Sequence, residues 1–353
     1  MATLVHNETF NDTHIFRMTD DTGMLQHSKY TLPDPNFGYT TDDNARALIM
    51  ALMLYERYKK KKYLDLVFRY AAFLLYAQNK YGRFRNFMGY DRKWLEEEGS
   101  EDCFGRCLWA IGYALSSKYT PNGIKSVLSN MLQKALPNVT SLHYLRAKAY
   151  SIIGLSYLDS PETRKLISEI AQSILCRYEA CRDGEWKWFE NIISYCNNVL
   201  PWSMIAAFRV TGEKKFLVAA RETLEFLGKI TFKDGFFRPV GCKGWLLKGE
   251  LPAEFDEQTV EACEGVLTYL EAYEATGETE YLHKAQKCHE WYEGLNSKGI
   301  SLIDEETGGC FDGLTRDGLN LNMGAESLVS YVISYLRITN INKQASYVED
   351  NTA

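Results

Sequence analysis

The sequence predicts an all-α fold, in which inner and outer helices alternate around one closed domain. Helical periodicity of the apolar residues runs through almost all of the 353 residues, whereas strand-like alternation is scarce and only eight prolines occur. The connections between the expected helices fall into two length classes. No Gly/Ser-rich linker divides the series, so we expect a single domain over residues 1–353, with 340–353 as a flexible C-terminal tail.

The expected helices are of two kinds. One kind is amphipathic: in residues 61–75, Tyr63, Val67 and Leu74 share an apolar face opposite charged positions. The other kind is nearly apolar all round and rich in small residues, as in 103–116, which suits the inside of the molecule. The predicted inner helices start near Asp42, Asp102, His143, Asn198, Asp256 and Gly324. The predicted outer helices start near Lys61, Asn122, Pro161, Gly212 and Glu280, with a short sixth one at 12–19.

The two classes of connection decide the architecture. Inner-to-outer turns are short and consist of turn-forming residues, as in 159–161, 211–214 and 276–279. Outer-to-inner connections are long and cover residues 79–101, 182–197, 231–255 and 296–323. Loops beyond about 12 residues in a compact domain are usually functional. Each long loop immediately precedes an inner helix, so we expect the long loops to share one end of the molecule.

This pattern resembles the six-hairpin (α/α)6 toroid of many carbohydrate-active enzymes, over almost the whole chain. Residues 38–46 (Gly-Tyr-Thr-Thr-Asp-Asp-Asn-Ala-Arg) and 324–327 (Gly-Ala-Glu-Ser) are similar to motifs of bacterial proteins of this group that lie near mannoside-degrading genes. The resemblance implies a funnel at the inner-helix N-termini where sugars bind. In some six-hairpin mannanases, adjacent aspartates are the catalytic pair. Fold alone does not fix function.

Composition narrows the classes of partner. A net charge of -6 with both signs mixed gives no footprint for nucleic acid. No apolar stretch approaches the ~20 residues of a membrane span, and the first residues lack a signal-peptide pattern. Nine cysteines are scattered without a CxxC pair, which favours the cytoplasm. No residue set has the spacing of a metal site or demands a cofactor.

The acidic helix starts are the first candidate catalytic residues. Asp42 and Asp43 can both favour the positive end of a helix dipole, but both cannot cap the helix. Capping therefore accounts for one, and the other is expected to point toward the axis. Asp102 repeats the arrangement, with Arg106 four residues later just as Arg46 follows Asp42. An i,i+4 ion pair on an inner helix would hold the carboxylate ionised, as a base or nucleophile requires.

The aromatic loop at 184–190 supplies candidate sugar-binding rings. Trp186, Trp188 and, further on, Tyr195 can either fill the core or offer apolar faces to pyranose rings. Glu190 lies beside these rings, and a carboxyl group next to aromatic walls is a candidate general acid.

Further candidates lie on or beside the other expected inner helices and within the 38–46 motif. Asp256 is either an N-cap or a ligand-binding residue. Glu257, one step further, is better placed to reach a ligand and is a candidate general acid. His143 and Arg146 open an inner helix, although a lone histidine there is more often structural. The remaining substrate-binding candidates are the loop and motif residues Tyr39, Arg46, Arg106, Arg238, Trp245, Asp312 and Glu326.

The leading functional hypothesis is a glycoside hydrolase acting on oligosaccharides through paired carboxyl groups. A sugar epimerase or isomerase using His27 and His143 is an alternative on the same fold. A phosphorylase holding phosphate with Arg46, Arg106 or Arg238 is another. A non-catalytic carbohydrate-binding toroid also fits. The sequence leaves the sugar, its linkage and the oligomeric state open.

Overall fold

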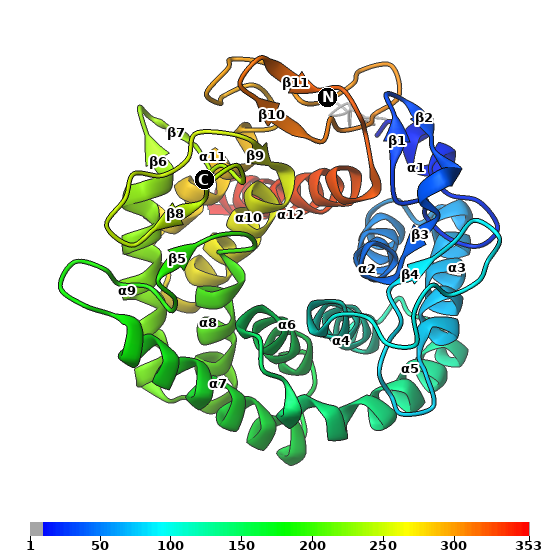
Figure 1. Cartoon of the computed structure of the whole chain (residues 1–353), viewed down its shortest axis with the longest axis horizontal. Helices are drawn as coiled ribbons and strands as arrows, with labels where there is room; N and C mark the ends of the chain where they lie inside the picture. Colours follow the sequence, from blue (N-terminus) through cyan, green and yellow to red (C-terminus); the bar gives the residue numbers. More distant parts are fainter. Residues whose placement is uncertain (1–9, 353) are drawn as a thin grey trace.

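A computed structural model describes residues 10–352, with side chains described up to residue 341. In this part of the chain, α-helices form two concentric layers around a common axis (Figure 1). The inner layer consists of α2 (Thr41–Tyr58), α4 (Glu101–Ser116), α6 (Leu145–Ser156), α8 (Val199–Thr211), α10 (Thr259–Thr276) and α12 (Ala325–Thr352). The outer layer consists of α3 (Lys61–Ala77), α5 (Asn122–Ala135), α7 (Pro161–Cys181), α9 (Lys214–Thr231), α11 (Thr279–Glu290) and the short α1 (Thr13–Arg17).

The inner layer is a closed ring. Each inner helix packs against the next in chain order, and α12 returns to pack against α2. Outer helices cover the ring from outside, so that α3 packs on α2, α9 on α8 and α11 on α10. The fold is therefore an (α/α)6 toroid, and the predicted alternation is confirmed. The helix starts agree with prediction to within a few residues.

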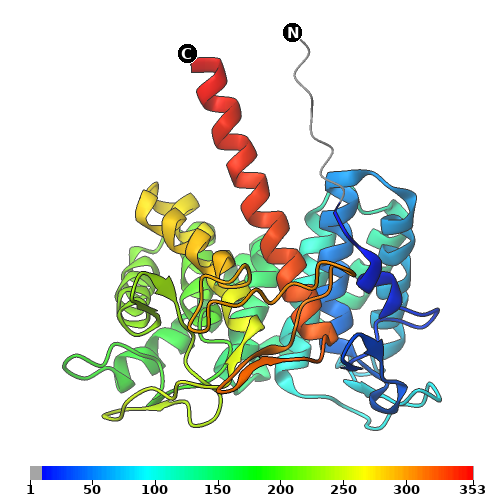
Figure 2. The ribbon, with the colours of Figure 1, turned by 90° about the horizontal axis from the view of Figure 1, so that it is seen from above.

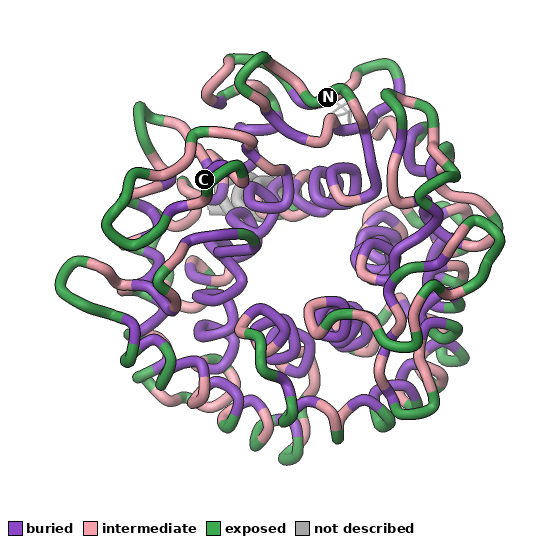
Figure 3. Tube along the Cα trace, viewed as in Figure 1, coloured by how far each residue is buried: buried purple, intermediate pink, exposed green. Residues whose placement is uncertain are grey.

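Burial follows the two kinds of helix. The inner helices are buried along most of their length, whereas the outer helices expose one face to solvent (Figure 3). In α10, for example, burial runs without interruption from Thr259 to Leu270. Viewed from the side, the long connections gather at one end of the ring, and α12 continues away from them (Figure 2). The side chains beyond residue 341 lie outside the described part, so the expected flexibility of 340–353 stays a prediction.

Short antiparallel strand pairs tie the long connections to one another. β3 (Tyr39–Thr40) pairs with β4 (Phe87–Met88), and β5 (Ile192–Ile193) pairs with β8 (Leu246–Leu247). Three strands, β9 (Glu257–Gln258), β10 (Gly313–Thr315) and β11 (Gly318–Asn320), form a sheet beside α10 and α12. Hairpins β1–β2 (Ser28–Lys29, Leu32–Pro33) and β6–β7 (Phe232–Lys233, Phe236–Phe237) and the 3-10 helices Pro35–Phe37 and Leu136–Ser141 complete the loops.

The start of α10 differs from the prediction. Asp256 does not cap this helix, because the chain first makes strand β9 and the helix begins at Thr259. Asp256 instead forms an ion pair with Lys243 at 3.1 Å. Because residues 257 and 258 pair with β10, the helix begins later than predicted. The periodicity of a short segment cannot predict this contact between distant parts of the chain.

Glycines allow α4 and α6 to approach closely. A Cβ atom added at Gly112 would overlap the carbonyl oxygen of Gly154, and one added at Gly154 would overlap that of Leu108. Gly105 makes a similar approach to Ala147 further up the same interface. Backbone atoms cannot rotate away as a flexible side chain can, so these positions accept no larger residue without separating the helices.

We expect Gly112→Ala to lower the free energy of unfolding by about 1–3 kcal/mol, because the added methyl group forces α4 away from α6. Gly123→Ala on outer helix α5 is the matched control, since nothing lies within 4 Å of a Cβ there. That control should be neutral or stabilising by up to about 1 kcal/mol, as alanine is the better helix former. Urea unfolding of both variants measures the difference. Equal effects of the two substitutions would contradict close packing at Gly112.

Candidate active site at the inner-helix N-termini

The N-terminus of α2 is capped from outside the helix. Asn86, in the loop before α4, accepts hydrogen bonds through Oδ1 from the backbone N–H groups of Thr41 (3.1 Å) and Asp42 (3.2 Å). The N-cap residue Thr40 makes no capping bond of its own. The expectation that one of the two aspartates caps this helix is therefore wrong. Because Asn86 satisfies these donors, the carboxylates of Asp42 and Asp43 both remain available for other partners.

The arginines of the acidic motifs pair across helices. Arg106 of α4 donates to Asp42 of α2 at 2.9 Å, in place of the predicted pair with Asp102. Arg46 donates to Asp43 at 2.6 Å and to Glu326 of α12 at 3.1 Å, in place of the predicted pair with Asp42. These contacts join α12, α2 and α4 at one rim. The predicted i,i+4 pairs are wrong, since Arg106 faces the neighbouring helix α2, and Arg46 faces both the preceding turn of α2 and the start of α12.

The adjacent aspartates differ in electrostatic environment. Burial alone would raise the pKa of Asp42, but the positive charges of Arg106 and Arg46 outweigh it, and the pKa lies below its ordinary value. Burial and then the negative charge of Asp42 raise the pKa of Asp43 to about 7. Arg46 opposes this rise without cancelling it. At neutral pH, Asp42 is therefore ionised while Asp43 is partly protonated.

A second group of polar residues lies around the starts of α4 and α6. Asp102 accepts a hydrogen bond from the hydroxyl of Tyr195 at 2.7 Å. Arg146 donates to Glu190 at 2.7 Å and to the carbonyl oxygen of Tyr195 at 2.5 Å, and its guanidinium lies 4.5 Å from the centre of the Tyr195 ring. The structure thus brings these four predicted residues together. Glu190 is thus held in an ion pair with Arg146 at the start of α6.

Several predicted aromatic residues do not face the rim. Trp188 is fully buried and packs against Phe189 and Phe226, the latter on outer helix α9. Trp186 also packs against Phe226 and donates its Nε1–H to the carbonyl oxygen of Glu190. Tyr39 is fully buried as well and donates to Asp20 at 2.5 Å. Trp188 and Tyr39 therefore have no ring face for a sugar, which corrects their prediction as substrate-binding residues.

The predicted residues near α10 form a structural cluster. Glu257 is fully buried, accepts a hydrogen bond from Trp291 at 2.7 Å and another from Ser297, and lies 3.5 Å from Arg238. Burial raises its pKa, but no part of the carboxyl group reaches solvent. Its predicted role as catalytic acid is therefore not supported by its position. Trp245 is half-buried, with its ring 6.3 Å from that of Tyr195.

The remaining predicted residues occupy different positions. Asp312 caps α12 from the preceding loop, accepting hydrogen bonds from the N–H of Gly324 (2.7 Å) and the hydroxyl of Ser327 (2.6 Å). Glu326, in the first turn of α12, keeps 42% of its side chain exposed beside Arg46. His143 is exposed and contacts Glu101 at 3.1 Å. Glu326 thus joins the Asp42–Asp43 group, whereas His143 does not.

Two buried glutamates on α10 were missed by sequence reasoning. Glu264 accepts a hydrogen bond from Tyr150 of α6, and Glu261 accepts two from Asn197, at 3.1 and 3.3 Å. Burial, followed by the charge of Glu264, raises the pKa of Glu261 to about 8. Burial also raises the pKa of Glu264. Two acids three residues apart in the nearly apolar first part of α10, residues 259–270, were the available signal.

The interior beneath the rim is polar. Arg106 donates to the sulfur of Cys196 at 3.2 Å and lies 5.2 Å from the centre of the Tyr150 ring. Several buried polar atoms of the inner helices have no protein partner: Arg46 Nη1, Arg106 Nε, Asn198 Oδ1, Glu261 Oε1 and Glu264 Oε2. Buried polar atoms are usually hydrogen-bonded. Ordered water is the usual partner of buried polar atoms that the protein leaves without one.

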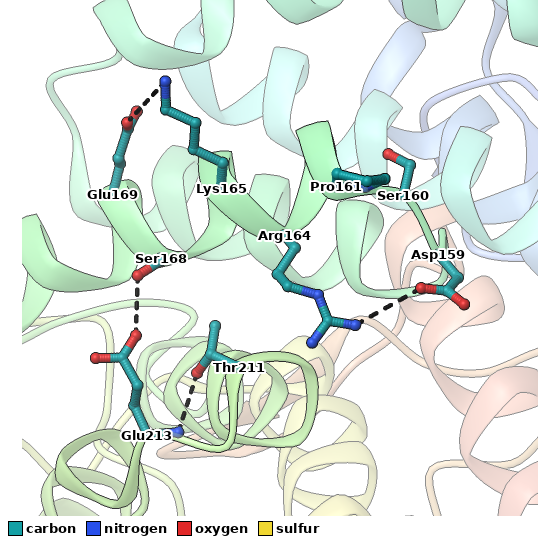
Figure 4. Close-up of a pocket in the computed structure, with 9 residues that line it drawn as sticks. All are labelled: Asp159, Ser160, Pro161, Arg164, Lys165, Ser168, Glu169, Thr211 and Glu213. Carbon is teal, nitrogen blue, oxygen red and sulfur yellow. Dashed lines mark hydrogen bonds and ion pairs between the residues drawn. The ribbon is translucent and has the colours of Figure 1, made fainter.

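Among the side chains described, up to residue 341, no group of three or more His, Cys, Asp or Glu residues could hold a metal ion. Among the helices described, none is long and apolar enough to cross a membrane. A hollow of about 650 Å³ lies at the short-turn end, between the α6–α7 and α8–α9 turns (Figure 4). Its polar groups pair with one another, as Arg164 does with Asp159 and Ser168 with Glu213, and it contains none of the predicted site residues.

Comparison with known proteins places the fold. No protein-family profile matches the chain, and no curated protein matches it by sequence. Among solved structures, a sugar epimerase from a ruminal bacterium is 15% identical over 95% of this chain and 97% of its own, with a TM-score of 0.71. The cellobiose 2-epimerase of Bacillus thermoamylovorans is 13% identical over 94% of this chain and 95% of its own, with a TM-score of 0.73.

A glycosidase is also similar to the chain. It is an inactive variant of an α-1,6-mannanase from Salegentibacter, in which two consecutive aspartates are replaced by asparagine, in complex with α-1,6-mannotriose. Its sequence is 12% identical over 92% of this chain and 95% of its own, with a TM-score of 0.60. Epimerases and mannanases thus share this toroid. At such low identity the similarity establishes the fold, and the chain has the (α/α)6 toroid fold of enzymes that act on sugars.

Proposed function

We propose that this protein is a glycoside hydrolase acting on oligosaccharides, with mannosides as the first class to test. The observation that carries the proposal is the Asp42–Asp43 pair, two adjacent carboxyl groups whose pKa values are shifted in opposite directions. Environments that separate the pKa values of two neighbouring acids are the arrangement that acid–base catalysis requires. Glycoside hydrolysis needs one protonated and one ionised carboxyl group at the scissile bond.

The roles follow from the charges. Asp43 donates its proton to the glycosidic oxygen as the bond from that oxygen to the anomeric carbon breaks. Asp42, kept ionised by Arg106, either attacks the anomeric carbon or takes a proton from the water that does so. Water supplies the hydroxyl group of the new reducing end in both courses. In the first course, water hydrolyses the ester formed at Asp42 and gives its proton to Asp43; in the second, Asp42 releases the proton it gained to solvent and Asp43 takes one up from solvent.

The neighbouring residues support this pair. Arg46 holds Asp43 and Glu326 together, which fixes the orientation of the proposed acid. Asp102 with Tyr195, and Glu190 with Arg146, offer hydrogen-bonding groups to sugar hydroxyls on the adjacent part of the rim. The inactive mannanase variant adds support, since consecutive aspartates are the residues replaced in that protein of the same fold.

A sugar epimerase or isomerase is the second candidate. The higher TM-scores of 0.71 and 0.73 with two epimerases, against 0.60 with the mannanase, favour it. The histidines that the sequence suggested for such chemistry give less support. His143 is exposed and paired with Glu101, and the ring of His27 packs edge-on against Phe37, 4.8 Å between centroids.

One experiment separates these functions. The protein is incubated with linear α- and β-linked manno- and gluco-oligosaccharides, with and without inorganic phosphate, and the products are followed by NMR. New reducing ends without phosphate dependence are the expected result. A change of configuration or of aldose to ketose without chain cleavage would establish the second candidate. Phosphate-dependent cleavage would indicate a phosphorylase, and binding without turnover a non-catalytic toroid.

The pH profile tests the assignment of Asp43. Its pKa of about 7 predicts that hydrolysis declines as the pH rises through 7, because the proton donor is lost. The charge of Glu326 contributes to that raised pKa, so Glu326→Gln should move the alkaline limb of kcat/KM to lower pH. Glu179→Gln on the exposed surface of α7 is the matched control and should leave the limb in place. An alkaline limb unaffected by Glu326→Gln would contradict Asp43 as the donor.

A further inference from the structure

Exposed aromatic side chains stand beside the starts of the inner helices. Phe87 is 41% exposed, Tyr144 is 69% exposed and Tyr195 is 38% exposed. Phe87 follows the capping residue Asn86, directly opposite Thr40 in the β3–β4 pair at the start of α2. Tyr144 immediately precedes α6, and Tyr195 lies in the loop that leads into α8. We call Phe87, Tyr144 and Tyr195 the aromatic arc.

Each residue of the aromatic arc is hydrogen-bonded to an acidic residue at, or in the loop before, the start of α4. The backbone N–H of Tyr144 donates to Glu101 at 3.0 Å, and the hydroxyl of Tyr195 donates to the next residue, Asp102, at 2.7 Å. The backbone N–H of Phe87 donates to Glu96 at 3.0 Å. These hydrogen bonds order the three residues before any ligand binds. Binding to their rings therefore costs little conformational entropy.

The aromatic arc extends past several inner helices. α2, α4, α6 and α8 are successive neighbours in the inner layer, and packed helices lie about 8–10 Å apart. A ligand that touches both Phe87 and Tyr195 must therefore be longer than a single pyranose ring. Aromatic rings bind the apolar faces of pyranoses, and exposed rings in sequence along a rim suit a chain of such units.

The charges beside the arc favour an uncharged chain. Arg46, Arg106 and Arg146 are each paired with a carboxylate, so none of them is free to neutralise an acidic sugar. Glu326 and Asp102 add negative charge on the same rim. A chain of uronic acids or sulfated sugars would meet repulsion there.

We propose that the aromatic arc binds successive units of an extended, neutral, linear oligosaccharide, so that the substrate is a glycan chain rather than a disaccharide. This inference rests on the proposed function for the position of the scissile bond, next to Asp42. The arc then provides subsites on one side of that bond, from the start of α2 to the loop before α8.

The test compares binding across chain lengths. Linear manno- and gluco-oligosaccharides of two to six units are titrated by calorimetry into the parent protein and into Phe87→Ala and Tyr144→Ala, and kcat/KM is measured with the same panel. Affinity in the parent should rise with chain length. In each variant, the ratio of the affinity for the longest chain to that for the shortest chain should be about three- to tenfold smaller than in the parent. Phe68→Ala removes a ring that is 51% exposed on outer helix α3 and should change nothing.

The outcomes separate the inference from the proposed function. Affinity that rises with length in the absence of any cleavage would support the arc and overturn the hydrolase. Cleavage with no dependence on length would support the hydrolase and overturn the arc. Unchanged length dependence in both arc variants, or an equal loss in Phe68→Ala, would also overturn it.

Discussion

Asp42→Asn is expected to lower kcat for oligosaccharide hydrolysis by about 10²–10⁴-fold, the range that loss of a catalytic base or acid usually costs. Asparagine has nearly the same shape and its carbonyl oxygen can still accept the hydrogen bond that Arg106 donates at 2.9 Å. It cannot carry the negative charge that both courses of the reaction need. The loss should therefore appear in kcat, while the fold and the affinity for oligosaccharide are largely kept.

A control isolates the effect of position from that of the amide. Asp159→Asn makes the same change at the opposite end of the toroid, where the aspartate lies 3.7 Å from Arg164 and its side chain is 99% exposed. Hydrolysis should be unchanged in that variant. If Asp42→Asn retained activity within a few-fold of the parent, the proposed pair would be wrong.

Replacing the neighbouring acid should give a different signature. Asp43→Asn removes the proton donor but leaves Asp42 ionised by Arg106. Aryl glycosides with acidic leaving groups need little protonation, so their cleavage should survive far better than that of natural oligosaccharides. Equal loss for both kinds of substrate would argue against Asp43 as the acid.

The fold was predictable because its signals are local and repeated. The apolar faces of helices such as 61–75, the small residues of 103–116 and the lengths of the turns are all properties of short segments. They placed six inner and six outer helices correctly to within a few residues. The start of α10 was predicted least accurately, because Glu257 and Gln258 pair with residues of β10 more than fifty positions away.

The site was only partly predictable, because side-chain partners depend on neighbours in space. Sequence spacing suggested that Arg46 would pair with Asp42 and Arg106 with Asp102. The ring geometry instead turns Arg106 toward Asp42 on the adjacent helix. Likewise, a loop rich in tryptophan could not reveal that Trp188 packs on outer helix α9. Position along the rim was predicted, whereas orientation within it required the structure.

Glu261, which the sequence analysis did not identify as important, is expected to make the free energy of unfolding depend on pH. Its carboxyl group is buried, and its pKa of about 8 lies well above the ordinary value of 4.5 that applies in the unfolded chain. Between these values the folded protein holds a proton that the unfolded chain releases. The unfolded state therefore binds fewer protons, and the free energy of unfolding falls as the pH rises from about 4.5 to 8.

We accordingly expect Glu261→Gln to flatten the pH dependence of stability. Glutamine stays neutral, and its side-chain oxygen can still accept from Asn197 as Glu261 does at 3.1 Å. Relative to the parent, the variant should gain stability between pH 5 and pH 8, on the order of 4 kcal/mol if the full shift applies. Urea unfolding at several pH values measures this difference, with Glu179→Gln on the surface of α7 as the control. Parallel curves for the parent and Glu261→Gln would mean that the buried carboxyl group is not protonated in the folded state. Glu261 would then be a buried negative charge at neutral pH.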